Sequence, residues 1–525
     1  MKLVSVSGMR AIEQEANARG VSYGQMMISA GEGVAKIILK RAATFTEKSA
    51  VALVGSGNNG GDALITLISL AREQWKVAAY LVRPRPADDP LLQLLRTNGG
   101  EIVEGGQEDD FKRLDQLLAV SSVLIDGVLG TGIKLPLRAE VVRVLAHVKN
   151  YSPRPYTVAV DCPSGVDCDS GEAADETLPA NITVCMEAVK RGLVALPAFG
   201  YAGKILKVDL GLPDDLVSQQ DIHTYMVDAD MVRVALPERR LDAHKGSFGT
   251  LMVVAGSVYY MGAALLSGKA AYRIGAGLVQ MAVASPLQAA LLSSLPEAIW
   301  VPLPDEDGCI SIEAVSVLRE HLERTTCMLI GPGLTTHEST AEFIKLLLND
   351  PVIKTKQKEA ENNFPMVIDA DGIRLLGQIP QWFKVLPPGS ILTPHPGEMS
   401  ILTGYKVSEI QQNRFDIALE FARRWGQVVV LKGALTVVAS PEGIIHVVPV
   451  ATPALARAGT GDVLAGMIAG LLAQKVPSFK AAWIGAYLHG RSGVLAAKRL
   501  GSAASVLASD VSNCIAGALN ELLTL

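Results

Sequence analysis

The sequence is poor in cysteine, in aromatic residues and in charge. Its 525 residues include six Cys, 5% aromatic residues and 19% charged residues. The cysteines form no C-x-x-C pair and no regular spacing, which argues against a disulfide framework and a cysteine-based metal site. We therefore predict reduced thiols in a cytoplasmic protein. The cysteines are Cys162, Cys168, Cys185, Cys309, Cys327 and Cys514.

A surplus of basic charge and a long apolar run are also missing. The 48 Lys and Arg against 53 Asp and Glu give a net charge of −5 without any basic tract, so no nucleic acid partner is expected. No apolar run reaches the roughly 18–20 residues of a membrane span without a charge or a Gly or Pro break. The first residues are soon followed by polar Arg10, Glu13 and Glu15, unlike a secretory signal. We therefore predict no membrane contact.

What the chain has instead is length and apolar segments. Its 525 residues exceed one ordinary core, and 49% of them are hydrophobic, so two or three globular domains are expected. A Gly-, Pro- and Asp-containing stretch near residues 212–228 suggests a boundary. We predict an N-terminal domain of residues 1–215 and a C-terminal domain of residues 225–525.

Short apolar strands alternate with helical patterns before this boundary, which predicts βαβ units and a parallel sheet, and a second α/β pattern follows the boundary. In the first part the predicted strands are 50–54, 77–82, 123–125, 157–160, 182–185 and 205–208, and the predicted helices are 64–72, 91–96 and 139–147. In the second part the predicted strands are 250–255, 327–330, 366–368, 390–392, 428–431 and 436–439. The polar segment 354–363 is predicted to be a solvated connection.

The first predicted strand is followed by Gly55-Ser56-Gly57-Asn58-Asn59-Gly60-Gly61-Asp62. This stretch contains the G-x-G-x-x-G pattern of dinucleotide sites, whose glycines let the backbone approach a phosphate. Its Asn and Asp oxygens can also bind a cation or ribose hydroxyls. The alternative is a plain glycine-rich turn with Asn in the left-handed conformation.

Two further strands end in polar groups. Asp126 is followed by the glycine loop 130–136, and Asp161 by a Pro-Ser-Gly turn that contains Ser164. Ordinary loops and an Asx-turn are the alternatives. Because parallel strands end at the same edge of a sheet, we expect all three loops to form one ligand site there.

In the second part, Gly459-Thr460-Gly461-Asp462 precedes an apolar helical run. The glycines expose backbone N–H groups to an anion at the helix N-terminus. Asp462 beside this anion site can remove a proton from a hydroxyl while the N–H groups hold a phosphoryl group. Phosphoryl transfer to an alcohol is the hypothesis, and an Asp that merely caps the helix is the alternative.

Other polar residues of this part have two interpretations each. Lys432, after a predicted buried strand, is placed for nucleotide phosphates or is a surface lysine. His395 lies between two prolines and either bonds the substrate or is structural. Glu398 either caps the following helix or contacts a metal-bound water.

These motifs resemble known families. Gly55–Asp62, Asp126–Gly132 and Asp161–Gly165 are similar to NAD(P)H-hydrate epimerases. The second part resembles ADP-dependent NAD(P)H-hydrate dehydratases, and residues 9–520 together resemble the bifunctional repair enzymes that combine both. The dehydratase-like motifs are His244–Gly246, Val254–Ser257, Gly262–Ala264, Gly275–Val279, Ile330–Gly333, Asp369–Asp371, Leu392–Glu398, Leu431–Thr436 and Ala458–Asp462.

The resemblance implies two three-layer α/β/α domains, a Rossmann-like N-terminal one and a ribokinase-like C-terminal one. It implies epimerisation of the R and S hydrates of NADH and NADPH (NADHX and NADPHX), and ADP-dependent dehydration of the S epimer to NAD(P)H, AMP and phosphate. K⁺ in the first domain, Mg²⁺ and the co-substrate ADP in the second, and a homo-oligomer are expected.

The resemblance also implies roles for residues. Asp161 and Asp462 are the expected catalysts of the two reactions. The epimerase hydrate contacts are Asn58, Asn59, Gly60, Gly61, Asp62, Gly130, Thr131, Gly132, Ile133, Lys134, Leu135, Pro136 and Asp161, and the K⁺ ligands are Asn59, Asp126 and Ser164. The dehydratase hydrate contacts are Ala263, Gly333, His395 and Asp462, and the ADP contacts are Lys432, Gly433, Ala434, Leu435, Thr436 and Gly461.

The chain departs from the families at several positions, and alternative functions remain open. Ala63 replaces a usual Gly, Ile28-Ser29 replaces Glu-Asn, and Ala454 and Arg457 stand where many relatives have Gly and Thr. The second part is alternatively a small-molecule kinase of the hydroxymethylpyrimidine or hydroxyethylthiazole type. The first part is alternatively a binding module without activity.

Overall fold

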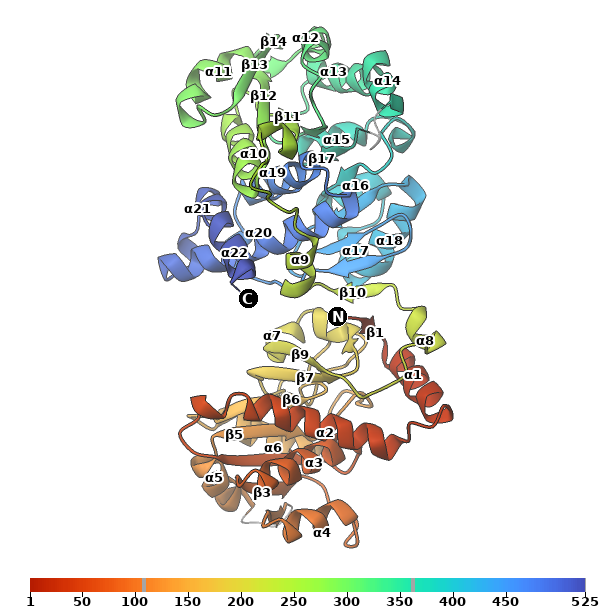
Figure 1. The fold of residues 1–525 in the computed structure, drawn as a ribbon, viewed down its shortest axis with the longest axis vertical. Coiled ribbons are helices and arrows are strands. Elements are labelled where there is room, and N and C mark those ends of the chain that lie inside the picture. The colour runs from red at the N-terminus through yellow and green to blue at the C-terminus, as the bar shows by residue number, and fades with distance from the viewer. Residues whose placement is uncertain (106–109, 360–363, 525) are drawn as a thin grey trace. The chain divides into compact units, whose positions relative to one another are not determined.

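The computed structural model describes residues 1–105, 110–359 and 364–524, which form two compact units, Met1–Met226 and Val227–Leu525. Each unit has its own sheet with helices packed on it, so both have the predicted α/β class (Figure 1). Among the described residues, the helices are too short or too polar for any of them to cross a membrane. All six cysteines are free thiols with buried side chains, as predicted.

The first unit is built on a seven-stranded parallel sheet with the order β4-β3-β2-β5-β6-β7-β9. The six predicted strands are all present. The added strand, β4, was missed because its Glu-Ile-Val-Glu sequence is short and half polar. The strands are β2 (Ser49–Val54), β3 (Lys76–Leu81), β4 (Glu101–Glu104), β5 (Val123–Gly127), β6 (Tyr156–Val160), β7 (Ile182–Met186) and β9 (Lys204–Val208).

Both faces of this sheet are covered, which explains why its central strands are apolar throughout. Ala50, Ala52 and Val54 of β2 point into one core, and Val51 and Leu53 point into the other. The first core is closed by α1 (Val6–Ala18), α2 (Tyr23–Leu39), α3 (Asn58–Arg72) and α4 (Pro90–Thr97). The second is closed by α5 (Asp110–Val120) and α6 (Ala139–Asn150). The result is three layers.

The rest of the first unit consists of short elements. Strands β1 (Leu3–Val4) and β8 (Val189–Lys190) pair in parallel as a separate two-stranded sheet. This pairing joins the start of the chain to the segment that follows β7. The remaining elements are α7 (Phe199–Ala202), α8 (Val217–Gln220) and β10 (Thr224–Met226).

In the second unit the strands run in the order β21-β20-β19-β18-β17-β16-β11-β12-β13. Neighbours from β19 to β13 are parallel, whereas β20 and β21 are added antiparallel. The strands are β11 (Thr250–Val254), β12 (Leu278–Ala284), β13 (Ile299–Leu303), β16 (Cys327–Ile330), β17 (Met366–Ile368), β18 (Ile391–Leu392), β19 (Val428–Leu431), β20 (Val437–Ala439) and β21 (Ile445–Val447). A hairpin of β14 (Asp305–Glu306) and β15 (Cys309–Ile310) lies outside this order.

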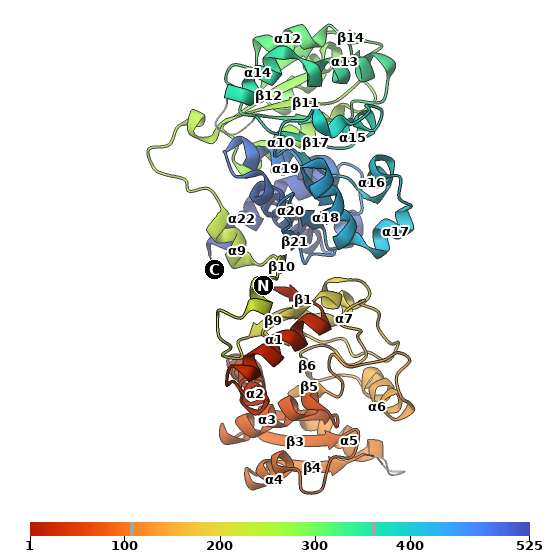
Figure 2. The same cartoon turned by 90° about the vertical axis from the view of Figure 1, so that its right-hand side faces the viewer.

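One face of this sheet is covered by α10 (Met261–Ile274), α19 (Thr460–Ala473) and α20 (Ser478–Leu500), which pack against one another (Figure 2). Small residues let α10 and α19 approach closely: a Cβ placed on Gly466 would lie 2.2 Å from the carbonyl oxygen of Ser267. The other layer contains α12 (Ala314–Glu320), α13 (Glu338–Asn349), α15 (Asp371–Leu376), α16 (Pro396–Thr403), α17 (Val407–Gln412) and α18 (Arg414–Trp425). The remaining helices are α9 (Ala229–Ala235), α11 (Ser285–Leu291), α14 (Pro351–Glu359), α21 (Ala508–Asn513) and α22 (Ile515–Leu523).

One sequence prediction for this unit was wrong. Helix α14 occupies residues 351–359, where a connection was predicted, because Pro351 begins a helix whose Ile353 is buried; residues 360–363 of the predicted connection lie outside the described residues. The sheet of this unit is mixed, because β19, β20 and β21 are joined by short turns that can only connect antiparallel strands.

Candidate functional sites

The three polar loops of the first unit meet at one edge of the sheet, because β2, β5 and β6 are direct neighbours. Helix α3 begins at Asn58, one residue after its N-cap, Gly57. A Cβ on Gly60 would lie 2.0 Å from the carbonyl oxygen of Gly55, so the close turn excludes any side chain at that position. Local packing alone therefore requires a glycine at position 60 of the motif.

The predicted K⁺ ligands are connected by hydrogen bonds in the structure. Asp126 is fully buried, and its carboxylate accepts bonds from the Ser164 backbone N–H at 2.8 Å and from the Ser164 hydroxyl at 2.5 Å. The Nδ2 of Asn59 donates to the carbonyl oxygen of Leu129 at 2.8 Å, and the Leu129 N–H donates to the Ser164 hydroxyl at 2.9 Å. Burial raises the pKa of Asp126, although the bonds from Ser164 oppose this shift.

The remaining predicted contacts surround this network. Asn58 is exposed, and Asn59, Gly60, Gly61 and Asp62 follow it in the first turns of α3. Loop 130–136 connects β5 to α6 and is partly or fully exposed. A Cβ on Gly130 would lie 3.3 Å from the Cβ of Asn59, so this loop begins directly beside the N-terminus of α3.

Asp161 is held by contacts that its sequence position does not reveal. Its backbone has a φ of 63°, a conformation that non-glycine residues rarely adopt. Its Oδ1 accepts a hydrogen bond from the Met186 N–H at 3.0 Å and an ion-pair bond from the Nζ of Lys190. Lys190 is 1% exposed. Burial by itself would lower the pKa of Lys190, but Asp161 and Cys185 outweigh it and raise that pKa.

Two more carboxyl groups lie near this pair. Burial raises the pKa of Asp62 to about 8, and the charges of Asp161 and Glu13 add to the shift while Lys190 opposes it. Burial also raises the pKa of Glu13. This raised pKa favours the protonated form of Asp62. Sequence reasoning missed Glu13 and Lys190, because neither belongs to a glycine-rich loop or a strand-end motif.

In the second unit, Asp462 lies in the first turn of α19, whose N-cap, Gly459, has a φ of 87°. A Cβ on Gly461 would lie 3.7 Å from the Nζ of Lys432 and 3.9 Å from Oδ2 of Asp369. Burial raises the pKa of Asp462 to about 7, the charge of Asp369 adds to the shift, and Lys432 opposes it. This carboxyl group can therefore exchange a proton near neutral pH.

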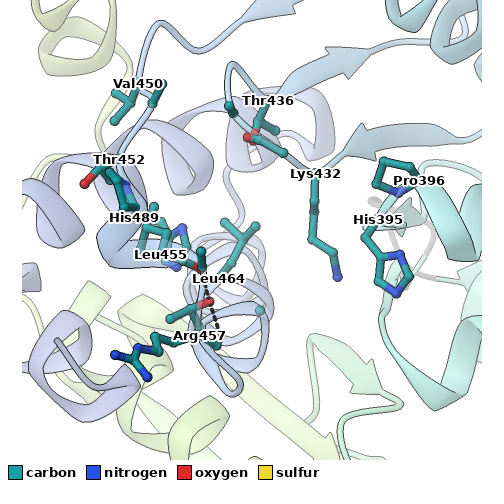
Figure 3. A pocket seen from close by; sticks show the side chains of 17 residues that line it. His395, Pro396, Lys432, Thr436, Val450, Thr452, Leu455, Arg457, Leu464 and His489 are labelled. Carbon is teal, nitrogen blue, oxygen red and sulfur yellow. Dashed lines mark hydrogen bonds between the residues drawn. The ribbon is translucent and has the colours of Figure 1, made fainter. Parts of the chain in front are cut away.

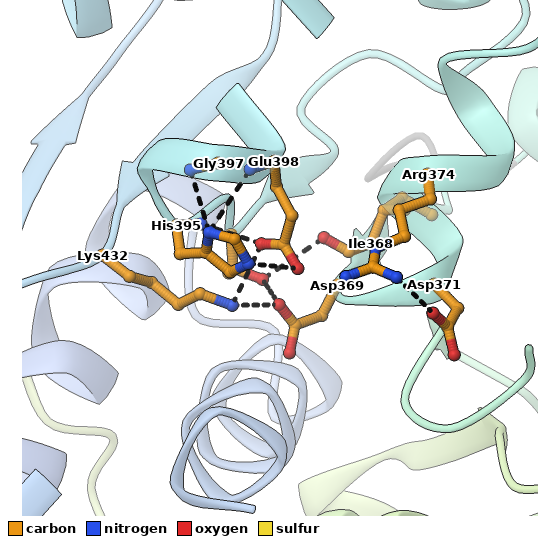
Figure 4. Close-up of polar contacts among 9 residues, drawn as sticks. Ile368, Asp369, Asp371, Arg374, His395, Gly397, Glu398 and Lys432 are labelled. Atoms are coloured by element: carbon orange, nitrogen blue, oxygen red, sulfur yellow. Dashed lines mark hydrogen bonds and ion pairs between the residues drawn. The ribbon is translucent and has the colours of Figure 1, made fainter. Parts of the chain in front are cut away.

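Lys432 connects two buried carboxylates, as Figure 4 shows. Its Nζ lies 2.5 Å from Oδ1 of Asp369 and 3.6 Å from Oε2 of Glu398. Burial would lower the pKa of Lys432, but Asp369 and Glu398 outweigh it and raise that pKa. Asp369 also accepts a bond from the Thr393 hydroxyl at 2.7 Å. Asp369 was part of a recognised motif but had no predicted role.

A cavity of about 730 Å³ opens beside this network (Figure 3). Its lining brings together six of the predicted ligand contacts from separate parts of the sequence. Apolar side chains such as Val450, Leu455 and Leu464 form the rest of its wall, together with His489. The predicted contacts that line it are His395, Lys432, Gly433, Ala434, Thr436 and Gly461.

Four of the predicted contacts do not line this cavity, and one of them is Asp462, in the first turn of α19. Leu435 is not among the described residues that line the cavity, because it is buried, with only 4% of its surface exposed. Ala263 and Gly333 are also not included, but they are close to each other: a Cβ on Gly333 would lie 3.0 Å from the Cβ of Ala263 and 2.8 Å from that of Tyr260. They form a separate patch at the start of α10.

His395 and Glu398 cap α16. The Nδ1 of His395 accepts bonds from the N–H groups of Gly397 at 2.9 Å and Glu398 at 3.3 Å, and Oε2 of Glu398 accepts from the His395 N–H at 2.8 Å. The side chain of His395 is still 49% exposed and borders the cavity. His395 can therefore cap the helix and contact a ligand at the same time. The contacts of Glu398 are those of a helix cap.

Comparisons with known proteins cover both units. Residues 251–516 match the family model of NAD(P)H-hydrate dehydratase, and residues 23–192 match that of the YjeF-related protein N-terminus. The bifunctional NAD(P)H-hydrate repair enzyme Nnr of Moorella thermoacetica is 35% identical over 89% of this chain and 87% of its own length. The enzyme of the same name from Coxiella burnetii is 33% identical over 96% of each chain.

A solved structure also matches the second unit. It is an ADP/ATP-dependent NAD(P)H-hydrate dehydratase from Bacillus subtilis, co-crystallised with ATP and Mg²⁺, with 32% identity and a TM-score of 0.48, and the match covers 57% of this chain and 98% of that one. The curated relatives match across both units, which favours a repair enzyme over a lone small-molecule kinase. The chain belongs to the family of bifunctional NAD(P)H-hydrate repair enzymes, which join an epimerase to an ADP-dependent dehydratase.

Proposed function

We propose that residues 225–525 form the dehydratase and that Asp462 is its general base. The observation that carries this assignment is the position of Asp462 in the first turn of α19, beside Lys432 and Asp369, with a pKa of about 7. Asp462 removes the proton of the substrate hydroxyl, and the hydroxyl oxygen attacks the terminal phosphorus of ADP. AMP leaves. The ring nitrogen then expels phosphate, and loss of a proton from the neighbouring carbon restores the NAD(P)H ring.

The nucleotide is proposed to occupy the 730 Å³ cavity. Lys432 and the backbone from Gly433 to Thr436 contact its phosphates, and the apolar wall accommodates its base. Among the described residues, no group of three His, Cys, Asp or Glu side chains is arranged to hold a metal. This fits Mg²⁺ that arrives with the nucleotide, because Mg²⁺ usually combines one or two carboxylates with substrate phosphates and water. Mg²⁺ would there neutralise phosphate charge.

We further propose that residues 1–215 form the epimerase, with Asp161 as its catalyst. Asp161 accepts the proton of the hydroxyl while the neighbouring carbon–nitrogen bond opens to an aldehyde, and it returns the proton to the nitrogen. Closure on the other face of the aldehyde gives the second epimer. The loops 58–62 and 130–136 hold the nucleotide.

K⁺ is the cation we propose for this domain. The groups that fit it are the carboxylate of Asp126, the amide oxygen of Asn59 and the hydroxyl of Ser164. A fully buried carboxylate whose pKa is raised by burial gains from a neighbouring cation, and oxygen ligands suit a hard one. The cation would fix the loops at the sheet edge. The reduced thiols support a cytoplasmic location, and a homo-oligomer stays a prediction.

The test uses separated R and S hydrates. With ADP and Mg²⁺, the S hydrate should regain reduced-nicotinamide absorbance at once, whereas the R hydrate should do so only at the rate of epimer exchange. Without ADP, the chain should interconvert the epimers and produce no NAD(P)H. Formation of a stable phosphorylated product from another small alcohol, with both hydrates left unchanged, would instead support a kinase.

A further inference from the structure

The ammonium group of Lys190 uses all of its hydrogen-bonding capacity inside the protein. An ammonium has three N–H donors. Those of Lys190 meet the Asp161 carboxylate and the carbonyl oxygens of Met186 and Ala188, both at 3.3 Å. Because the side chain is 1% exposed, Lys190 has no donor left for a substrate. Any effect on the reaction must pass through Asp161.

The two oxygens of Asp161 are not equivalent. Oδ1 accepts from Lys190 and from the Met186 N–H at 3.0 Å. Among the described residues, no donor to Oδ2 is found, which leaves this oxygen for a ligand at the sheet edge. The backbone is fixed as well, because the Asp161 N–H donates to the carbonyl oxygen of Val184 at 2.8 Å despite the φ of 63°. One oxygen is anchored and the other is available.

Other acidic groups surround the Asp161–Lys190 pair. Two carboxyl groups face it, Asp62 from α3 and Glu13 from α1, and both have a raised pKa. The thiols of Cys162 and Cys185 are also close. Like charges and burial both disfavour a further negative charge. Lys190 is the buried cation of this cluster.

We propose that Lys190 is a positioning residue of the epimerase, which balances the charge of the Asp161 carboxylate and orients it so that its Oδ2 receives the proton of the substrate hydroxyl. This inference rests on the proposed role of Asp161. Strand β8, which carries Lys190, is held by its parallel pairing with β1. The start of the chain therefore supports the epimerase site.

The test measures exchange of the R and S hydrates by chromatography in full-length variants without ADP, so that the dehydratase is idle. Lys190→Met should lower kcat about 10²-fold, a typical loss for a general base, and leave KM within about twofold. Lys207→Met is the matched control. Lys207 lies on β9, which pairs with β7, is about one-third exposed, and its Nζ is 3.8 Å from Glu187. It should keep the wild-type rate.

A double variant separates positioning from a loss of structure. Asp161→Asn with Lys190→Met removes both charges and leaves no unpaired ion in the core. If Lys190 acts through Asp161, the double variant should be no slower than Asp161→Asn alone, because the two losses are not additive. The inference would be overturned if the kcat loss of the double variant equalled the product of the two single losses. It would also be overturned if Lys190→Met kept the wild-type kcat while Asp161→Asn was inactive. An active Asp161→Asn would instead overturn the proposed catalyst itself.

Discussion

The Nζ of Lys432 lies 2.5 Å from Oδ1 of Asp369, a contact between residues that are 63 positions apart (Figure 4). The same Nζ lies 3.6 Å from Oε2 of Glu398. In the proposed dehydratase, the nucleotide phosphates compete with these carboxylates for one cation. The charge of Lys432 also lowers the pKa of Asp462. Nucleotide binding to Lys432 and protonation of Asp462 are therefore coupled.

Replacing Asp462 should remove the base and leave the nucleotide site. Asp462→Asn keeps the shape of the side chain, so we expect kcat for the S hydrate to fall about 10²–10⁴-fold with ADP affinity little changed. Calorimetric ADP titration and the recovery of reduced-nicotinamide absorbance measure the two effects. Asp416→Asn, at an exposed position in the first turn of α18, is the charge control. A wild-type rate for Asp462→Asn would exclude this residue as the base.

The dehydratase should lose activity on the acid side of neutrality. Burial raises the pKa of Asp462 to about 7, and a base acts only when deprotonated. The rate under saturating ADP should therefore rise as the pH increases through about 7 and level off above it. Initial rates across buffers of equal ionic strength check this, with unfolding followed in parallel. A flat profile from mildly acidic to neutral pH would contradict the assignment.

Removing the Lys432 cation should affect both binding and proton transfer. Lys432→Met should weaken ADP binding about 10–100-fold, the typical effect of one lost charge-assisted hydrogen bond. Because Lys432 lowers the pKa of Asp462, the acid limb of the rate profile should move to higher pH. The double variant Asp369→Asn with Lys432→Met leaves no unpaired charge beside Thr393, so it should recover stability but not ADP affinity. Recovery of affinity in that variant would show that Lys432 does not bind the nucleotide.

The epimerase should depend on a monovalent cation. K⁺ should raise the melting temperature of the first unit, since a ligand that binds only the folded state stabilises it, and should accelerate exchange of the hydrates. Asp126→Asn removes the buried charge and should abolish both responses to K⁺ while Li⁺ has little effect on either protein. Equal melting curves and equal exchange rates of the wild type with and without K⁺ would remove the cation from the proposal.

The close contact between α10 and α19 predicts that a single methyl group destabilises the second unit. Gly466→Ala places a Cβ 2.2 Å from the carbonyl oxygen of Ser267, so the helices must separate, and we expect a loss of about 1–3 kcal/mol. Gly517→Ala in α22 is the control, because the added Cβ would lie 3.5 Å from the Cδ1 of Leu495, which is an ordinary contact distance. Urea unfolding measures the free energy of unfolding of both variants, compared where the dependence of that free energy on urea concentration is unchanged. A Gly466→Ala protein as stable as the control would refute the packing argument.

The sequence alone determined the elements and the position of the motifs along them. Apolar strands alternating with helical patterns predicted an α/β fold, because hydrophobic periodicity is a local property. The glycine loops after β2 and β5 and the Gly-Thr-Gly-Asp at the start of α19 were placed correctly at element ends, since a close backbone turn needs glycine at defined positions. Family resemblance then indicated both activities.

Only the tertiary structure decided which side chains meet. Lys190 reaches Asp161 across 29 positions, and Lys432 reaches Asp369 across 63, so no spacing rule predicts either pair. The neighbouring positions of β2, β5 and β6 and the antiparallel addition of β20 and β21 also depend on how strands assemble into sheets. The physical reason is common to all of them: burial decides which charges need partners and where a proton stays, and burial is created only when distant segments pack together.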